Sequence, residues 1–255
     1  DLHFGRADEI LASALTAMIH RLTPDVIVVS GDLTQRARIH EFQRAREFLD
    51  ANRFPTIVVP GNHHVPLENL FVRFLRPLAR YKKFISEDLS PTYQDSEVAI
   101  LGINTARSFT RSGGSISRKQ IDAARQFFCD AGRDVVKIVV THHPFDFPGE
   151  RSEKYLVRRA RETVMALGEC EADLYLAGHA HVPFPRYPAH RYRIAHHTAL
   201  VVQAGTGAPL RTQIPRALVR IEHLRIHAAP DDSQPAVAGP PHPLELAVKA
   251  LARPA

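Results

Sequence analysis

The chain has 255 residues, of which 44% are hydrophobic and 24% are charged. This length suits one large α/β domain, and the composition excludes a disordered or fibrous chain. The net charge of +6, from 33 basic and 27 acidic residues, favours anionic partners such as phosphorylated small molecules, nucleic acid or an anionic membrane surface. A solubilising basic face is the alternative explanation of this charge.

Targeting and redox signals are sparse. No apolar run approaches the roughly 18 residues of a membrane-spanning helix. The two cysteines, Cys129 and Cys170, fall on separate predicted helices and are too few for a disulfide framework. We therefore expect a cytoplasmic protein. The sequence begins at Asp1 without an initiator Met, so a preceding or cleaved segment stays open.

Helical and strand patterns alternate through the first hundred residues. Apolar side chains recur at helical spacing over residues 7–22 and 37–51, and more weakly over 67–78. Short apolar runs predict buried strands at residues 25–30 and 56–59. This alternation indicates an α/β fold.

The second half continues the same rhythm. Strands are predicted at residues 98–103, 135–140 and 174–176, and helices at 117–131 and 153–167, with Ser117 as an N-cap. From residue 191 to 227 the pattern turns to β, with candidate strands at 199–203 and 218–226. We expect one domain over residues 1–228, followed by a Pro-rich tail with a short helix over 229–255.

Polar side chains follow four of the predicted strands directly. They are Gly31-Asp32, Gly61-Asn62-His63, His142-His143 and Gly178-His179-Ala180-His181. A fifth group, Asp1-Leu2-His3, would follow a strand if the residues before it form one. Loops beyond the carboxyl ends of strands in open α/β sheets gather into one crevice, so these side chains are expected at one edge.

The donor set at this edge suits a metal site. Mixed carboxylate, imidazole and amide ligands favour divalent cations such as Mn, Fe, Zn or Co. In Asp1-x-His3 and His179-x-His181, an extended backbone would point both side chains the same way. Each motif alone is more often a turn or a chance pair, but the ordered set of five indicates a metal centre.

With its flanking residues, this set resembles the calcineurin-like metallophosphoesterases. The segments Val29-Ser-Gly-Asp-Leu-Thr34, Val59-Pro-Gly-Asn62 and Gln203-Ala-Gly-Thr-Gly207 are similar to the bacterial cyclic-nucleotide phosphodiesterase-like branch. The resemblance covers about residues 1 to 225. It implies a four-layer αββα sandwich of two mixed β-sheets flanked by helices.

The resemblance also implies a role for each motif residue. One of two divalent or trivalent ions would be held by Asp1, His3, Asp32 and His181. The other would be held by Asp32, Asn62, His142 and His179, with Asp32 bridging. His63 would act as the catalytic acid, and Asn62 and His143 would contact substrate. The family usually has Asp or Glu where this chain has His64, so the orientation and pKa of His63 are open.

The expected function is hydrolysis of a small phosphodiester, such as a cyclic nucleotide, by a hydroxide that bridges two metal ions. One alternative is a pyrophosphatase acting on a nucleotide-linked lipid, and another is a non-catalytic scaffold that retains the fold. No basic stretch is interleaved with aromatic residues, and Trp is absent, so nucleic acid is not expected as a partner. Peripheral contact with a membrane stays open.

Overall fold

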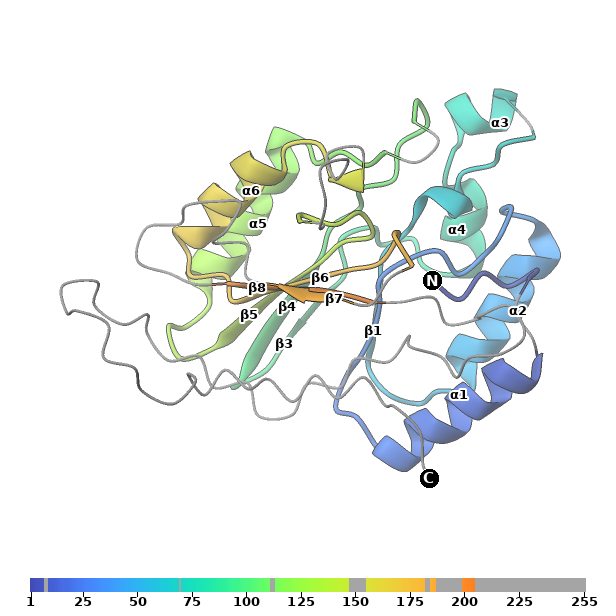
Figure 1. The fold of residues 1–255 in the computed structure, drawn as a ribbon, viewed down its shortest axis with the longest axis horizontal. Helices are drawn as coiled ribbons and strands as arrows, with labels where there is room; N and C mark the ends of the chain where they lie inside the picture. The colour runs from blue at the N-terminus through green and yellow to red at the C-terminus, as the bar shows by residue number, and fades with distance from the viewer. Residues whose placement is uncertain are drawn as a thin grey trace.

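Two β-sheets lie face to face in the middle of the molecule, with helices on both outer sides (Figure 1). The computed structural model describes residues 1–6, 9–68, 70–110, 113–146, 155–181, 184–186 and 199–204. The predicted strand at 218–226 and the tail at 229–255 lie outside these residues. The proposed boundary between domain and tail is therefore still a prediction.

The smaller sheet pairs β1 (Ile27–Val29) with β2 (Thr56–Val58) in parallel. The larger sheet has the order β3-β4-β5-β6-β8-β7. Its strands are β3 (Thr92–Gln94), β4 (Val98–Gly102), β5 (Val136–Val140), β6 (Leu174–Ala177), β7 (Phe184–Arg186) and β8 (Leu200–Gln203). Strands β4, β5, β6 and β8 run parallel, and β3 and β7 close the edges antiparallel, so this sheet is mixed as expected.

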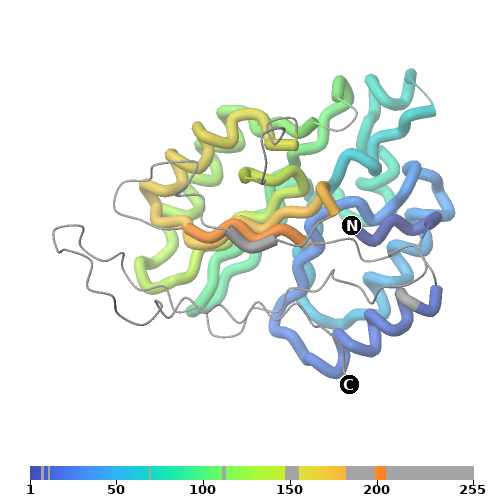
Figure 2. Tube along the Cα trace, in the orientation of Figure 1, coloured from blue at the N-terminus to red at the C-terminus, as the bar shows by residue number. Residues whose placement is uncertain are grey.

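Six α-helices and one 3₁₀ turn complete the described part of the chain. They are α1 (Glu9–Leu22), α2 (Ile39–Asp50), η1 (Asn62–His64), α3 (Leu70–Leu75), α4 (Ala79–Phe84), α5 (Arg118–Asp130) and α6 (Ala160–Gly168). Helices α5 and α6 cover the outer face of the larger sheet, and α1, α2 and α4 cover the smaller one (Figure 2).

Three hydrophobic cores fill the spaces between these layers. Along β4, Ala99 and Leu101 pack in the core under α5 and α6, whereas Ile100 packs between the sheets. In β2, Val58 joins the core of α1, α2 and α4, and Ile57 faces the larger sheet. Side chains of a strand alternate between its two faces, so both faces of each sheet are buried. The αββα sandwich is thus confirmed.

Several predicted elements differ in detail. The helix expected over residues 67–78 is formed only by α3, which ends before Pro77, since proline cannot continue a helix; α4 begins beyond the expected range. Helix α6 begins only at Ala160, because Arg159 adopts a left-handed backbone with φ of 68°. The short edge strands β3 and β7 were not predicted. Strand β7 contains Pro185, which is tolerated mainly at sheet edges. Ser117 caps α5 as expected, since its hydroxyl accepts from the Gln120 N–H.

A disulfide links Cys129, at the end of α5, to Cys170, just after α6. The sequence did not predict this bond, because the cysteines are 41 residues apart and meet only through helix packing. Disulfides persist mainly in oxidising compartments, and the expected cytoplasmic location stays a prediction. Among the described helices, none is both long and apolar enough to cross a membrane.

Candidate metal centre

Five loops meet at the carboxyl ends of the parallel strands and bring the predicted polar residues together. The loops after β1, β2, β5 and β6 carry Asp32, Asn62, His142 and His179. The N-terminal segment joins them, since the His3 N–H donates to the Asp32 carbonyl (2.9 Å). The structure therefore places all seven predicted ligand residues in one region, contributed by both sheets.

One half of the centre is built around His142. Its Nδ1 lies 2.8 Å from the carbonyl oxygen of Ser30, which can only accept, so Nδ1 carries the proton. The lone pair on Nε2 then faces Asp32 Oδ2 at 3.0 Å and Asn62 Oδ1 at 2.9 Å. His179 adds a second nitrogen, with Nδ1 3.0 Å from the same Asn62 oxygen. Imidazole ligands of metals typically donate their other N–H in this way.

Asp1, His3 and His181 form the other half. Ligand atoms of these three residues all lie within 4.8 Å of one another. The Nε2 atoms of His3 and His181 are 3.1 Å apart. Two nitrogens bound to one tetrahedral zinc at 2.0–2.1 Å would be about 3.3 Å apart, so this spacing fits a shared cation. Asp1 Oδ2 also accepts the backbone N–H of His179 (2.8 Å), which joins the two halves.

The buried polar atoms fit metal ions better than they fit one another. Among the described residues, the buried Asp32 Oδ2 and His143 Nε2 have no hydrogen-bond partner. A buried carboxylate oxygen without a donor is costly unless a cation neutralises it. The chemistry of this donor set, with carboxylate and imidazole atoms converging, therefore suits two cations bridged by Asp32.

The titration of these groups points the same way. Burial lowers the pKa of His3 and of His179 to about 3. Burial alone would raise the pKa of Asp32, but His142, His63 and His3 beside it hold that pKa well below its ordinary value. At neutral pH the two imidazoles are therefore neutral and the carboxyl is ionised. Metal binding requires these protonation states.

Backbone conformation, rather than extended alternation, orients several of these side chains. His3, Asp32, His179 and His181 all have positive φ, between 40° and 74°. The expectation of an extended backbone at Asp1-x-His3 and His179-x-His181 is therefore wrong. Non-glycine residues at positive φ are uncommon and cluster at functional sites, where surrounding contacts hold them.

Glycines let these loops approach closely. A Cβ at Gly61 would lie 2.1 Å from Asp32 Oδ1, and one at Gly31 would lie 2.5 Å from His142 Nδ1. Gly31 also has a φ of 106°, which side chains rarely adopt. Both glycines are therefore required by the packing of the site.

His63 is held at the edge of the centre. Its Nδ1 lies 2.6 Å from the carbonyl oxygen of Gln35, so Nδ1 carries a proton and Nε2 is the other exchangeable position. Its backbone N–H donates to Asp32 Oδ1 (2.9 Å), and its ring lies edge-on to His3 at 4.8 Å. The orienting partner of His63 is thus the Gln35 carbonyl rather than the side chain at position 64.

His64 is fully buried and bonds to backbone instead. Its Nδ1 lies 2.8 Å from the N–H of Gly61, and its Nε2 lies 2.9 Å from the N–H of Leu33. Burial lowers its pKa to about 3, so the ring is neutral. A neutral imidazole has one acceptor nitrogen, so one of the two backbone N–H groups faces another N–H. A carboxylate could accept from both.

Replacing His64 with Glu is expected to stabilise the metal-loaded protein. Satisfying one more buried N–H contributes about 1–3 kcal/mol. For a domain of this size, 1 kcal/mol raises Tm by about 2–4 °C. Calorimetry of His64→Glu and of His40→Glu, which makes the same charge change at an exposed site, measures this effect. A lower Tm specific to His64→Glu would show that burying the carboxylate costs more than the added hydrogen bond contributes.

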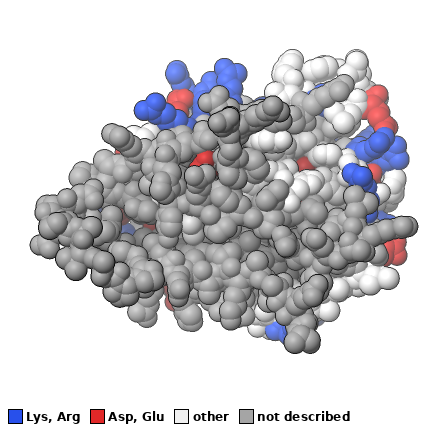
Figure 3. Space-filling model, viewed as in Figure 1, with Lys and Arg blue, Asp and Glu red and all other residues white. Residues whose placement is uncertain are grey.

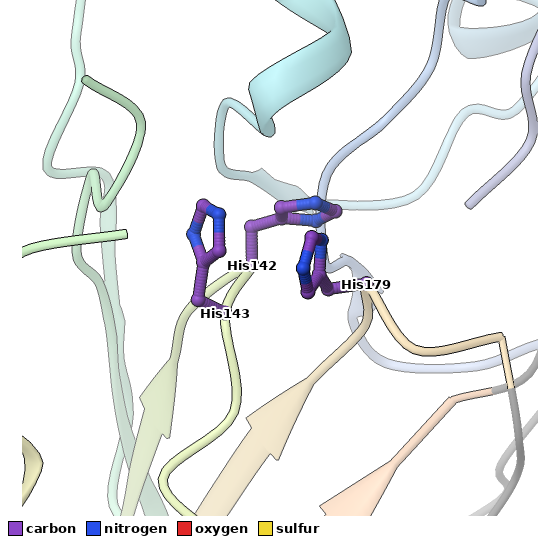
Figure 4. A group of neighbouring side chains, drawn as sticks. All are labelled: His142, His143 and His179. Atoms are coloured by element: carbon purple, nitrogen blue, oxygen red, sulfur yellow. The ribbon is translucent and has the colours of Figure 1, made fainter. Parts of the chain in front are cut away.

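Figure 4 shows His143 beside His142 and His179 at the ends of β5 and β6. The ring centroids of His143 and His179 are 4.6 Å apart, and ligand atoms of all three residues lie within 4.8 Å of one another. His143 Nδ1 is hydrogen-bonded to the Thr105 hydroxyl (2.8 Å). His143 thus faces the centre, where a contact with substrate or with a cation is geometrically available.

Sequence reasoning missed Thr105. Arg107 is half-buried, and its guanidinium donates to the carbonyls of Asn104 and Ala106 and to Gln120 Oε1. Thr105 follows β4 as Asp32 follows β1, so the strand-end rule could have found it. However, hydroxyl side chains are common after strands, so Thr105 alone does not indicate a functional site.

Comparison with known proteins agrees with the fold. A family model described as calcineurin-like phosphoesterase matches residues 1–183. The glycerophosphodiester phosphodiesterase GpdQ of Enterobacter lignolyticus is 31% identical over 144 residues, which is 56% of this chain and 49% of that protein. A probable GpdQ of Arcobacter nitrofigilis is 26% identical over 161 residues, 62% of this chain and 57% of that one. The chain thus spans about half the length of these curated relatives.

Two solved structures share the fold. A dimetal phosphatase from Danio rerio has a TM-score of 0.57 at 13% identity, over 78% of both chains. The purple acid phosphatase PPD1 from yellow lupin has a TM-score of 0.53 at 13% identity, over 69% of this chain and 34% of that one. With the family match spanning most of the sequence, the chain belongs to the calcineurin-like phosphoesterases.

Proposed function

We propose that this protein is a metal-dependent hydrolase of small phosphodiesters. The observation that supports this most directly is the convergence of six other carboxylate, amide and imidazole side chains around the buried Asp32 carboxylate. The family and the names of the curated relatives point to the same chemistry. No comparison favours the pyrophosphatase or the scaffold, and a scaffold has no need of a complete ligand set.

The ligand assignment is part of the proposal. Asp1, His3 and His181 would hold one ion, and Asn62, His142 and His179 the other, with Asp32 shared. When bound, two such ions supply charge for the phosphoryl oxygens and lower the pKa of a water. Nitrogen and oxygen donors together suit Mn, Fe, Zn or Co.

The remaining residues act on the substrate. His63 would donate a proton from Nε2 to the leaving oxygen, while the Gln35 carbonyl holds its Nδ1 proton and its ring orientation. Asn62 and His143 would contact the phosphodiester. The charge of Arg107 favours an anionic substrate, since its hydrogen bonds in the structure go to neutral acceptors.

A substrate screen tests this function. After metal loading, turnover of bis(p-nitrophenyl) phosphate, a glycerophosphodiester and cyclic AMP is expected to exceed that of p-nitrophenyl phosphate, and EDTA should abolish it. A preference for the monoester would instead indicate a phosphatase. Absence of turnover with every metal, while two ions bind per chain, would favour the scaffold.

A further inference from the structure

Six of the nine exposed large apolar side chains in the described residues lie in one place. They form an apolar patch composed of Leu67, Leu70, Phe71, Phe74, Leu75 and Phe109. Phe71 is 74% exposed and Phe109 is 89% exposed. In Figure 3 the surface at the upper right, in the region of α3, shows a white area with charged side chains at its right-hand margin. Exposed apolar patches on this scale usually mark an interaction site.

The apolar patch is held in place by defined contacts. The buried Arg73 side chain donates to the Pro66 carbonyl (3.2 Å) and to the Thr110 carbonyl (2.7 Å). The rings of Phe74 and Phe109 are 5.3 Å apart. The guanidinium thus ties α3 to the loops on both sides, while the apolar side chains of the helix face outward.

Basic residues outnumber acidic ones around the apolar patch: Glu68, which lies between Leu67 and Leu70, is paired with Arg36 and Arg38. The segment from residue 70 to 84 contains Arg73, Arg76, Arg80, Lys82 and Lys83, and no Asp or Glu. Arg76, Lys82 and Lys83 are exposed. Phe and Leu beside Arg and Lys are typical of segments that lie in the interface of anionic membranes. Lys is depleted in protein interfaces, and a second copy docked on the same patch would bring its exposed Arg76, Lys82 and Lys83 against the same three residues.

Two short segments join the apolar patch to the metal centre along the chain. Leu67 lies three residues after His64, at the end of the loop that carries Asn62 and His63. Phe109 lies four residues after Thr105, whose hydroxyl is bonded to His143. Both loops that form the patch therefore begin at the centre.

We propose that the apolar patch and its basic flank dock this protein on the surface of an anionic lipid bilayer. The aromatic and leucine side chains enter the headgroup boundary, and the basic side chains contact the anionic headgroups. The docking is peripheral, and it stands whether or not the protein hydrolyses phosphodiesters. Binding is expected to weaken at high salt, since the electrostatic contribution is screened.

Vesicle co-sedimentation tests the docking, using the full chain with phosphatidylcholine vesicles and with vesicles containing 30% phosphatidylglycerol. The protein is expected to bind only the anionic vesicles. Phe71→Ser/Leu75→Ser should lower the partition coefficient at least about tenfold. Ile10→Ser/Ile39→Ser is the matched control, since it removes two apolar side chains that are 78% and 51% exposed elsewhere. Equal loss in both double variants would overturn the assignment of the patch.

Charge variants distinguish binding to an anionic bilayer from binding to another partner at the apolar patch. Arg76→Gln/Lys82→Gln/Lys83→Gln should lower binding to anionic vesicles roughly 100-fold, since each basic residue near such a surface contributes about fivefold. Turnover of a soluble diester should stay unchanged in all variants, because none of these residues is in the candidate centre. If wild-type protein ignores anionic vesicles, the proposal is wrong. If Phe71→Ser/Leu75→Ser also converts a dimer to a monomer, the patch is a contact between two copies.

Discussion

Replacing Asp32 with alanine is expected to remove both metal ions and essentially all hydrolytic activity. Its Oδ2 lies 3.0 Å from His142 Nε2, and its Oδ1 accepts the N–H of His63. Asp32 also joins two separate groups of closely spaced ligand atoms, one with His3 and His63 and one with Asp1 and His142. Without this carboxylate, both cations lose a negative ligand in a buried site. A loss of several kcal/mol of charge stabilisation corresponds to at least about 10³-fold in kcat/KM.

The measurement is metal content by elemental analysis together with turnover of bis(p-nitrophenyl) phosphate. Asp50→Ala is the matched control, because Asp50 is a largely exposed carboxylate on α2 that pairs with Arg46. It should keep two metals and full activity. Asp32→Asn retains the shape and an acceptor oxygen and should bind metal weakly. Full metal content in Asp32→Ala would rule out the bridging assignment.

Replacing His63 with alanine is expected to leave both metals bound but lower turnover about 10²- to 10⁴-fold, the range for a general acid. The structure leaves Nε2 as the position from which His63 can give a proton, because Nδ1 donates to Gln35. Protonation matters most when the leaving group is a poor one. Turnover of alkyl diesters should therefore fall more than turnover of the nitrophenyl diester, whose leaving group departs without protonation.

His40→Ala, at an exposed position on α2, provides the control for loss of a histidine. An equal loss on aryl and alkyl diesters would remove His63 from the role of acid. Loss of a metal in His63→Ala would make it a ligand instead. That outcome has a structural basis, since a His63 ring nitrogen lies within 4.8 Å of ligand atoms of His3 and Asp32.

The sequence predicted the residues of the candidate site better than their conformation. Asp32 and His142 follow strongly apolar runs, and the carboxyl ends of parallel strands must meet at one edge. Such long-range convergence is encoded by the order of strands. By contrast, the left-handed backbone at His3 and His181 depends on contacts with distant loops, which no local pattern carries.

Other features lay beyond the sequence for the same reason. His64 bonds the N–H of Leu33, a residue 31 positions away, so its role follows only from packing. The Cys129–Cys170 bond needs the Cα atoms within bonding range, and their 4.8 Å separation is set by how α5 and α6 pack. The end of α3 before Pro77, by contrast, could have been predicted from the sequence, because proline cannot continue a helix.

Each of the two sheets contributes residues to the candidate centre. Asp32 and Asn62 come from the loops after β1 and β2, and His142 and His179 from those after β5 and β6. Ions that bind only the folded chain stabilise it by RT ln(1 + [L]/Kd), which is about 4 kcal/mol at a thousandfold excess over Kd. If the proposed ions bind, the melting temperature of this protein is expected to rise with free metal concentration. Thermal assays in chelating buffers would underestimate its stability.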